Sequence, residues 1–385
     1  MTIYNTYDRI EIEITSNCNA RCSGCSRTLN GETNPQLTVA DLTVEDFIAR
    51  VPAEALHKKS IEFCGVFGDA IMHKNLIPII EYINSTKPLR VSIDTNGGVQ
   101  KPEFWKKLAQ LGVKVTFSVD GHRETNHLYR VNTNFDIILR NMKAYADGGG
   151  WGNWEYIAFD HNEHEIEAAR LEAERLNFDF NVRRNSRNTH EGYKSVAKVK
   201  ENGKVVKKEI EIKQTSKEYQ HSQVKETEFE LNDEAVQKLV DIKCLYYHDR
   251  KLYLGFDGRL WPCCYFGDLY NGQGNPQIIG KDANKYEFLS FEKIRKLDKK
   301  YGVGWNSILN YSWEEILGHE YYNKVLPGTF NSNGSNFSTD DVVPKCALKC
   351  RKGGSIREVE RQFFTKPEEN VYEKDYIFDK NMYDK

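Results

Sequence analysis

The strongest constraint on the fold is a regular alternation of strand-like and helix-like segments in the first half of the chain. Six short segments rich in β-branched or alternating apolar residues predict strands, at residues 9–15, 60–65, 89–95, 113–120, 154–160 and 178–184. Helical patterns separate them, at residues 44–58, 75–85, 102–112, 135–149 and 163–177. Pro52 weakens the first of these helices, and Gly112 ends the third. Such alternation predicts βαβ units and a parallel sheet that presents its ligands at the carboxyl ends of the strands.

A cysteine loop follows the first predicted strand and therefore lies at that end of the sheet. The segment NCNARCSGC, residues 17–25, holds three thiols, Cys18, Cys22 and Cys25, with no fourth cysteine nearby. Four Cys thiolates close an iron–sulfur cluster, so three would leave one iron open to a substrate or cofactor. The alternative is a zinc knuckle completed by a distant ligand such as a histidine.

Composition limits the class of protein. The chain has 385 residues, enough for two domains, and a formal net charge of −2 with both signs interspersed, which argues against a nucleic-acid partner. The first residues lack the pattern of a signal peptide, and no apolar stretch is long enough to span a membrane. We therefore expect a cytoplasmic protein, in which nine cysteines indicate metal binding or catalysis rather than disulfides.

Four segments, in order, resemble motifs of the radical S-adenosylmethionine (radical SAM) superfamily. They are the CxxxCxxC loop, FCGVFGDAIMHKNL (63–76), DTNGG (94–98) and FSVDGHRETNHLYR (117–130). The similarity covers about residues 8 to 184 and implies a partial (β/α)6 TIM-like barrel. It departs from the family pattern at Gly24, where many members have an aromatic residue, and at Gly68-Asp69-Ala70, where Gly-Glu-Pro is usual.

The resemblance also implies a cofactor and a set of contacts. In that family the open iron of a 4Fe-4S cluster chelates S-adenosyl-L-methionine (SAM). Reductive cleavage then yields a 5′-deoxyadenosyl radical that takes a hydrogen atom from the substrate. The matching positions for SAM contacts are Gly68, Asp69, Asn96, Ser118 and Asp120. Two alternatives stay open, because Asp120 could instead cap the turn at Gly121 and Asn96 could instead bond the backbone at its strand end. No catalytic residue is identified.

A second group of cysteines lies late in the chain, at Cys244, Cys263, Cys346 and Cys350. The Gly258-x4-Cys263 spacing and the segment 308–322 resemble the SPASM and twitch extensions of radical SAM enzymes. The resemblance implies one closed auxiliary 4Fe-4S cluster, with a four-cysteine zinc site as the alternative. Cys264 could replace Cys263 as a ligand, and Cys64 is expected to be a buried small side chain.

These features predict a radical SAM barrel at 1–184, a polar insertion or linker at 185–232 and a small SPASM/twitch-like domain at 233–385. The polar segment could form an exposed hairpin that turns at ENGK, or a flexible linker, and a helix is expected at 233–242. The resemblance favours modification of a peptide or protein, with an electron donor such as flavodoxin or ferredoxin. The alternatives are radical oxidation of a small molecule such as a sugar or aminoglycoside, and a non-catalytic iron–sulfur or zinc protein. No membrane or nucleic-acid partner is expected.

Overall fold

The computed structural model describes residues 7–183 without 30 and 36, together with 194–201, 204–211, 216, 242, 244–273, 285–330, 343, 346 and 350. The predicted helix at 233–242 lies outside the described residues except for Ile242, and so do most of 185–232 and the stretch 331–341.

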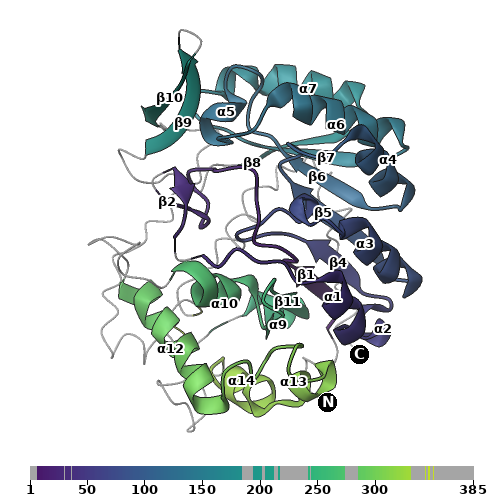
Figure 1. Ribbon diagram of the computed structural model, residues 1–385, viewed down its shortest axis with the longest axis vertical. Coiled ribbons are helices and arrows are strands. Elements are labelled where there is room, and N and C mark those ends of the chain that lie inside the picture. Colours follow the sequence, from purple (N-terminus) through teal and green to yellow (C-terminus); the bar gives the residue numbers. More distant parts are fainter. Residues whose placement is uncertain are drawn as a thin grey trace, which may run out of the picture.

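The six predicted strands all form and pair in parallel. They are β1 (Arg9–Ile12), β4 (Ser60–Phe63), β5 (Arg90–Thr95), β6 (Lys114–Ser118), β7 (Gly152–Ile157) and β8 (Asp179–Arg183). Their spatial order β1-β4-β5-β6-β7-β8 follows the order of the chain, as expected when each strand is followed by a helix that crosses back over the same face. The sheet is curved, with the helices on its outer side (Figure 1). This mostly parallel sheet confirms the predicted partial barrel.

Two further strands extend the sheet beyond β1. β11 (Lys251–Leu254) pairs with β1 in parallel, so that Glu11 is opposite Tyr253, and β12 (Leu260–Trp261) pairs with β11 in the antiparallel direction. The complete order is β12-β11-β1-β4-β5-β6-β7-β8. The place of these two strands in the barrel sheet was not predicted from the sequence. The later part of the chain therefore shares a sheet with the first half, while the division into domains stays a prediction.

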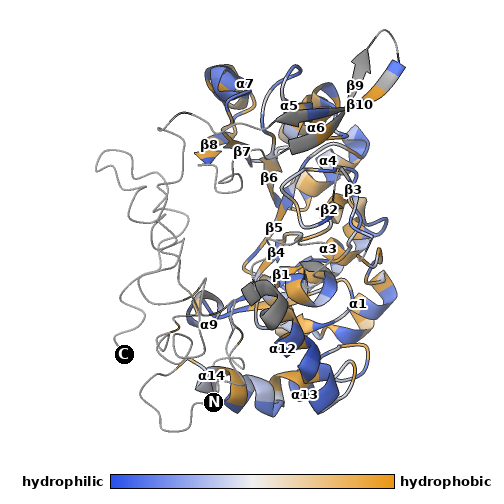
Figure 2. Cartoon of the chain, turned by 90° about the vertical axis from the view of Figure 1, so that its left-hand side faces the viewer, coloured by the Kyte–Doolittle hydropathy of each residue, from blue (hydrophilic) through white to orange (hydrophobic). Residues whose placement is uncertain are grey.

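Helices cover the outer face of the sheet. The longer ones are α3 (Leu76–Ser85), α4 (Pro102–Gln110), α6 (Phe135–Asp147) and α7 (Ile166–Arg175). In α3 the buried residues Leu76, Ile79, Ile80 and Ile83 recur at the helical spacing and pack in the main core. Figure 2 shows hydrophilic and hydrophobic residues on the helices around the sheet.

The single helix predicted over 44–58 is wrong in one respect, because the chain forms two short helices there. α1 (Val44–Arg50) starts after Thr43, whose side chain accepts the Asp46 N–H, and α2 (Ala53–Leu56) follows Pro52. Proline has no N–H and clashes with the preceding turn of a helix, so it breaks the helix instead of only weakening it. Pro52 takes the N-cap position of α2, where neither property is costly.

Shorter elements complete the described chain. In the first half they are β2 (Thr28–Leu29), β3 (Glu32–Thr33), α5 (Asn126–Tyr129) and the 3₁₀ turns η2 (Ala70–Met72) and η3 (Glu163–Glu165). In the second half they are α9 (Leu245–His248), α10 (Cys264–Asp268), α12 (Lys285–Tyr301), α13 (Trp313–Gly318), α14 (Leu326–Gly328) and the π-helical turns η4 (Leu269–Gln273) and η5 (Tyr321–Val325). Among the described helices, none has the length and apolar character required to cross a membrane.

The polar segment after β8 contains a hairpin, so the first of its two alternatives holds there. β9 (Lys194–Glu201) and β10 (Lys204–Glu211) pair in the antiparallel direction, with Glu201 opposite Lys204. The hairpin lies beside the turn between β2 and β3 (Figure 1), where Lys207 pairs with Glu32. This insertion therefore adjoins the segment that directly follows the cysteine loop.

The two faces of the sheet differ sharply in polarity, because side chains alternate along each strand. The outer positions are apolar and join the main core with the helices, as Ile10, Ile61, Ile93 and Phe117 do. The inner positions are polar on successive strands, with Glu11 opposite Glu62, Glu62 opposite Ser92, and Asp94 opposite Thr116. A polar inner face beside the strand ends is suited to binding a ligand.

Candidate functional site

The cysteine loop leaves β1 and bends back over the carboxyl ends of the strands. Its backbone is fixed by hydrogen bonds from Arg21 N to Val131 O at 2.9 Å and from Cys25 N to Cys22 O at 3.1 Å. Cys22 is buried, while Cys18 and Cys25 are half-buried. The three cysteines belong to one cluster with Tyr129 and Phe159, so their side chains gather in one apolar environment at the predicted end of the sheet.

Nitrogen donors point at all three sulfurs. They are the Ala20 N–H and Asn96 Nδ2 at 3.4 and 3.7 Å from Cys18 Sγ, Arg130 Nη1 at 3.9 Å from Cys22 Sγ, and the Arg27 N–H at 3.5 Å from Cys25 Sγ. Such donors stabilise thiolates, which are the form that binds iron. Burial, followed by the nearby Asp69 carboxylate and the other thiols, raises the pKa of Cys18 well above its usual range.

This donor set fits a cluster with one iron left open. Burial, the Asp69 carboxylate and the other thiols raise the pKa of Cys18, and the positive charge of a cluster's iron would act in the opposite direction. In a cluster each thiolate binds a different iron, so the three sulfurs need not meet at one ion. Within the described ranges, no three His, Cys, Asp or Glu side chains converge on the position of a single metal ion.

Gly68 and Asp69 lie directly against the start of the cysteine loop. A Cβ atom on Gly68 would lie 1.8 Å from the carbonyl oxygen of Thr15, so the close packing of two backbone segments requires glycine there. The Asp69 N–H donates to Asn17 O at 2.8 Å. These two contacts fix the loop after β4 to the segment that leads into Cys18.

The carboxylate of Asp69 joins the ends of two neighbouring strands. It is 5 % exposed, and its Oδ2 atom accepts hydrogen bonds from Asn96 N at 2.9 Å, Asn96 Nδ2 at 2.6 Å and Thr95 Oγ1 at 3.0 Å. Its Oδ1 atom accepts the Ile71 N–H at 3.3 Å, which caps the turn η2. Since Asn96 also contacts Cys18, the chain Asp69–Asn96–Cys18 is continuous. Both oxygens of Asp69 therefore have partners within the protein.

Ser118 and Asp120 lie at the end of β6, but their surroundings differ. Ser118 is half-buried on the inner face, whereas Asp120 is fully buried. The Asp120 carboxylate accepts Arg130 Nε at 2.5 Å and the Ile157 N–H at 2.6 Å. It therefore orients Arg130 toward Cys22 and secures the end of β7. The sequence offered two roles for Asp120, contact with SAM and capping of the turn at Gly121. The structure adds a third, the buried ion pair with Arg130.

Between the strand ends the inner face carries an accessible carboxylate, Asp94. Nearby protein atoms partly shield Asp94 from water, and this is the main cause that raises its pKa to about 7. The Glu155 carboxylate raises the pKa as well, while a hydrogen bond donated by Thr116 opposes the rise. Glu155 itself pairs with Arg183. Asp94 precedes Asn96 by two residues, so this carboxylate lies close to the cysteine loop.

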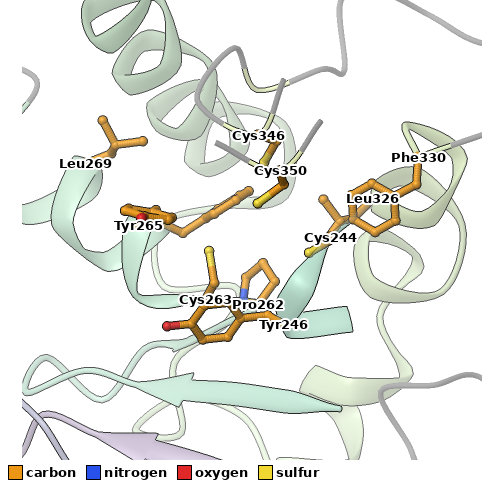
Figure 3. A pocket seen from close by; sticks show the side chains of 11 residues that line it. Cys244, Tyr246, Pro262, Cys263, Tyr265, Leu269, Leu326, Phe330, Cys346 and Cys350 are labelled. Atoms are coloured by element: carbon orange, nitrogen blue, oxygen red, sulfur yellow. The ribbon is translucent and has the colours of Figure 1, made fainter. Parts of the chain in front are cut away.

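The second group of cysteines lines a pocket in the C-terminal half. Figure 3 shows Cys244, Cys263, Cys346 and Cys350 around one space, and the other lining residues are Tyr246, Pro262, Tyr265, Phe266, Leu269, Leu326 and Phe330. Cys346 and Cys350 lie one helical turn apart, because Cys350 N donates to Cys346 O at 2.9 Å. Burial and the neighbouring thiols raise the pKa of Cys346. The structure thus brings together the four cysteines that the sequence grouped.

Cys264 points elsewhere. Its sulfur lies 2.9 Å from the hydroxyl oxygen of Tyr246, and that hydroxyl donates to Glu11 Oε2 at 2.6 Å. Cys263 lines the pocket, and Cys264 is not among the residues that do. Of the two adjacent cysteines, Cys263 is therefore the one placed with the other three. Cys64 directly follows β4 and is half-buried, so it is less enclosed than expected.

Comparison with known proteins identifies the first half of the chain. Residues 12–173 match the family model described as the radical SAM superfamily. Over these residues the chain is similar to the radical SAM superfamily. The FeMo cofactor biosynthesis protein NifB of Frankia alni is 30% identical over 121 residues, which are 30% of this chain and 24% of that protein. The chain therefore matches about a quarter of the length of that relative.

Two solved structures are similar to this chain at low sequence identity. Streptococcus suis SuiB bound to S-adenosylmethionine has a TM-score of 0.45 and 14% identity, covering 68% of this chain and 61% of that one. Native anSMEcpe with bound AdoMet has a TM-score of 0.48 and 14% identity, covering 92% of this chain and 95% of that one. Radical SAM domains use a 4Fe-4S cluster and SAM, so the match over residues 12–173 indicates these two cofactors.

Two contributors to this radical SAM site were not found from the sequence. Arg27 is buried and donates to the carbonyl oxygen of Ser16, which holds the cysteine loop against its own entry. Glu13 is also buried and accepts the N–H groups of Phe67 and Gly68. In the sequence, Glu13 is one polar residue of an alternating strand pattern, and Arg27 is one polar residue of a loop. Neither pattern marks the residue as part of a site. The one signal for Glu13 in the sequence is its place near the carboxyl end of the predicted strand 9–15, where the ligands gather.

Proposed function

We propose that this enzyme holds a 4Fe-4S cluster through Cys18, Cys22 and Cys25 and cleaves SAM reductively. The observation that carries the proposal is the convergence of strand-end residues on the cysteine loop. Asn96 after β5 and Arg130 after β6 both reach sulfur atoms of that loop. A loop that only bound zinc would not need donors from the ends of two other strands.

A 4Fe-4S cluster held by Cys18, Cys22 and Cys25 would supply the electron for reductive cleavage of SAM, and that cleavage would start hydrogen abstraction from the substrate. The residues of the chain orient the groups and exclude water. By the resemblance, Gly68 and Asp69 would hold the methionine amino group, and Ser118 on the inner face would offer a hydroxyl to the ribose. Asn96 supports this set, because it binds both Asp69 and Cys18.

We also propose that Cys244, Cys263, Cys346 and Cys350 hold one closed auxiliary 4Fe-4S cluster in a reduced SPASM- or twitch-like extension. Four thiols complete the coordination, and their neighbours in the pocket include the apolar side chains Leu269, Leu326 and Phe330. Such a cluster receives or passes an electron, or it stabilises the C-terminal half.

The proposed substrate is a peptide or protein, and oxidation of a small molecule is the second candidate. The first rests on the likeness of the second cysteine group to extensions found on peptide-modifying enzymes. The polar inner face, with the accessible Asp94, favours the second by offering a hydrogen-bonding surface for a sugar or amine. To separate the two candidates, the enzyme is incubated with a peptide library and with aminoglycosides under conditions that yield 5′-deoxyadenosine. The substrate class is the one whose molecules lose hydrogen.

The experiment that tests the SAM chemistry compares cysteine variants after anaerobic reconstitution. Replacing Cys18, Cys22 and Cys25 together with Ala should remove one cluster's iron and abolish formation of 5′-deoxyadenosine with dithionite. Cys64→Ala is the matched control, because Cys64 lies outside both groups, and it should retain iron and cleavage. Formation of 5′-deoxyadenosine by the triple variant would show that the cluster is held elsewhere.

A further inference from the structure

A buried carboxylate, Glu13, lies beneath the loop that presents Gly68 and Asp69. Glu13 directly follows β1, its side chain is on the same face as Glu11, and it is 2 % exposed. Its backbone N–H donates to Leu254 O at 2.9 Å, so it continues the pairing of β1 with β11. An ionised carboxylate at such a depth is costly unless hydrogen bonds compensate its lost hydration.

The hydrogen bonds of Glu13 divide between two parts of the molecule. Oε1 accepts the Phe67 N–H at 2.6 Å and the Gly68 N–H at 2.9 Å. Oε2 accepts the hydroxyl of Tyr253, which lies on β11. One oxygen therefore holds two successive N–H groups of the loop after β4, and the other is held by the C-terminal half. A carboxylate that accepts several donors fixes their positions strongly, because charge-assisted hydrogen bonds are short and directional.

The loop that Glu13 holds leads directly to the proposed SAM contacts. Beyond Gly68, the N–H of Asp69 is bound by Asn17, and its carboxylate binds Asn96, which reaches Cys18. Phe67 also packs edge-on against Phe256, with ring centroids 6.3 Å apart. A displacement of the backbone at Phe67 and Gly68 would therefore shift Asp69 and Asn96 together, relative to the cysteine loop.

We propose that Glu13 is a positioning residue for SAM, acting through the N–H groups of Phe67 and Gly68, and that Tyr253 of β11 fixes Glu13 from the C-terminal half. This inference rests on the proposed function, because it assumes that the loop at Gly68 and Asp69 faces SAM. The plainer alternative is that Glu13 only satisfies buried N–H groups and stabilises the fold.

The test compares Glu13→Gln with Glu11→Gln in the reconstituted protein. Both residues are buried carboxylates two positions apart on one face, and each has a tyrosine partner, but Glu11 bonds Tyr246 and Lys251 instead of the loop. We expect Glu13→Gln to weaken SAM binding by about tenfold or more, as loss of a charged acceptor does. We expect Glu11→Gln to leave the SAM dissociation constant within about twofold, which corresponds to about 0.4 kcal/mol. Calorimetry, with iron content checked in each sample, makes the measurement.

A pH series supplies a readout that a purely structural role would not change. Burial raises the pKa of Glu13 to about 7, and the nearby Asp257 carboxylate also raises it. The hydrogen bonds from Tyr253, Gly68 and Phe67 oppose the rise. The other charged group that faces Glu13 is Arg27. Protonation below that pH weakens its acceptance of the two N–H groups, so SAM affinity of the unaltered enzyme should fall as the pH drops through about 7. Glu13→Gln should lack this component.

Each outcome is decisive for one of the two proposals. If the unaltered enzyme does not bind SAM, the proposed function fails and not the role of Glu13. If it binds SAM and Glu13→Gln binds equally well at every pH, the positioning role is overturned. Should Glu13→Gln fail to fold, Tyr253→Phe removes only the hydroxyl and should weaken SAM binding by several-fold, about the effect of one hydrogen bond. An unchanged affinity in Tyr253→Phe would then overturn the role.

Discussion

Replacing Asp120 by Asn separates a structural role from contact with the ribose of SAM. The Asp120 carboxylate is fully buried and pairs with Arg130 at 2.5 Å, and the Arg130 side chain is 13 % exposed. Asn keeps an oxygen for the Ile157 N–H but removes the charge, which leaves a buried guanidinium without its partner. Breaking a buried ion pair on one side costs about 3–5 kcal/mol. We therefore expect the free energy of unfolding to fall by about that amount.

The matched control is an exposed pair with almost the same geometry. Arg123 Nε lies 2.6 Å from Asp136 Oδ1, with side chains 60 % and 61 % exposed. Asp136→Asn should change the free energy of unfolding by less than about 1 kcal/mol, because water screens the charges. Urea unfolding under anaerobic conditions measures both variants. If Asp120→Asn unfolds like the unaltered protein and loses only SAM affinity, the carboxylate contacts the ribose and the structural argument is refuted.

Three further predictions follow from single side chains. Gly68→Ala should abolish SAM binding while iron content is retained, because its Cβ would lie 1.8 Å from the Thr15 carbonyl oxygen; calorimetry that finds normal affinity would contradict this. Cys264→Ala should leave the iron content unchanged, since Cys264 contacts Tyr246 and is not among the residues that line the cysteine pocket, and a loss of one cluster's iron would show that it is a ligand. Nearby protein that partly shields Asp94 from water, followed by the Glu155 carboxylate, raises its folded-state pKa to about 7, so its protonated form favours folding. That contribution is complete at low pH and is lost as the pH rises through about 7. Asp94→Asn should therefore gain stability relative to the unaltered protein between about pH 4 and 7 in urea titrations, and a constant difference would argue against the shift.

The sequence predicted the part of the fold that depends on local pattern. The six parallel strands follow from short apolar alternation between helical segments, and the hairpin at 194–211 follows from its strand-like halves around a turn. β11 could not be placed, because the four residues KLYL specify a strand but not its neighbour, and pairing with β1 depends on contacts some 240 residues apart. The break at Pro52 was underestimated, because the lost N–H and the clash act together on a short helix.

The candidate site could be predicted where its chemistry depends on the type and spacing of residues close together in the sequence. Three cysteines in one loop point to iron, and four more point to a second site. The partners of Asp69 and Asp120 could not be predicted, because they come from other strand ends and depend on which hydrogen bonds the folded backbone leaves available. Asn96 shows this well, since it reaches both Asp69 and Cys18 from one position.

The first strand joins the two halves of the molecule and so relates the two cysteine sites. On one side it leads into the cysteine loop, and on the other it pairs with β11. Glu11 on β1 binds Tyr246, a residue of the second cysteine pocket, and Lys251 of β11 at 2.8 Å. Glu13 joins Tyr253 of β11 to the loop at Gly68. Burying two carboxylates, one on β1 and one directly after it, is costly, and apolar residues at these positions would carry no such cost. Glu11 therefore fixes the side of the second cysteine pocket, and Glu13 separately fixes the loop beside the first cysteine site.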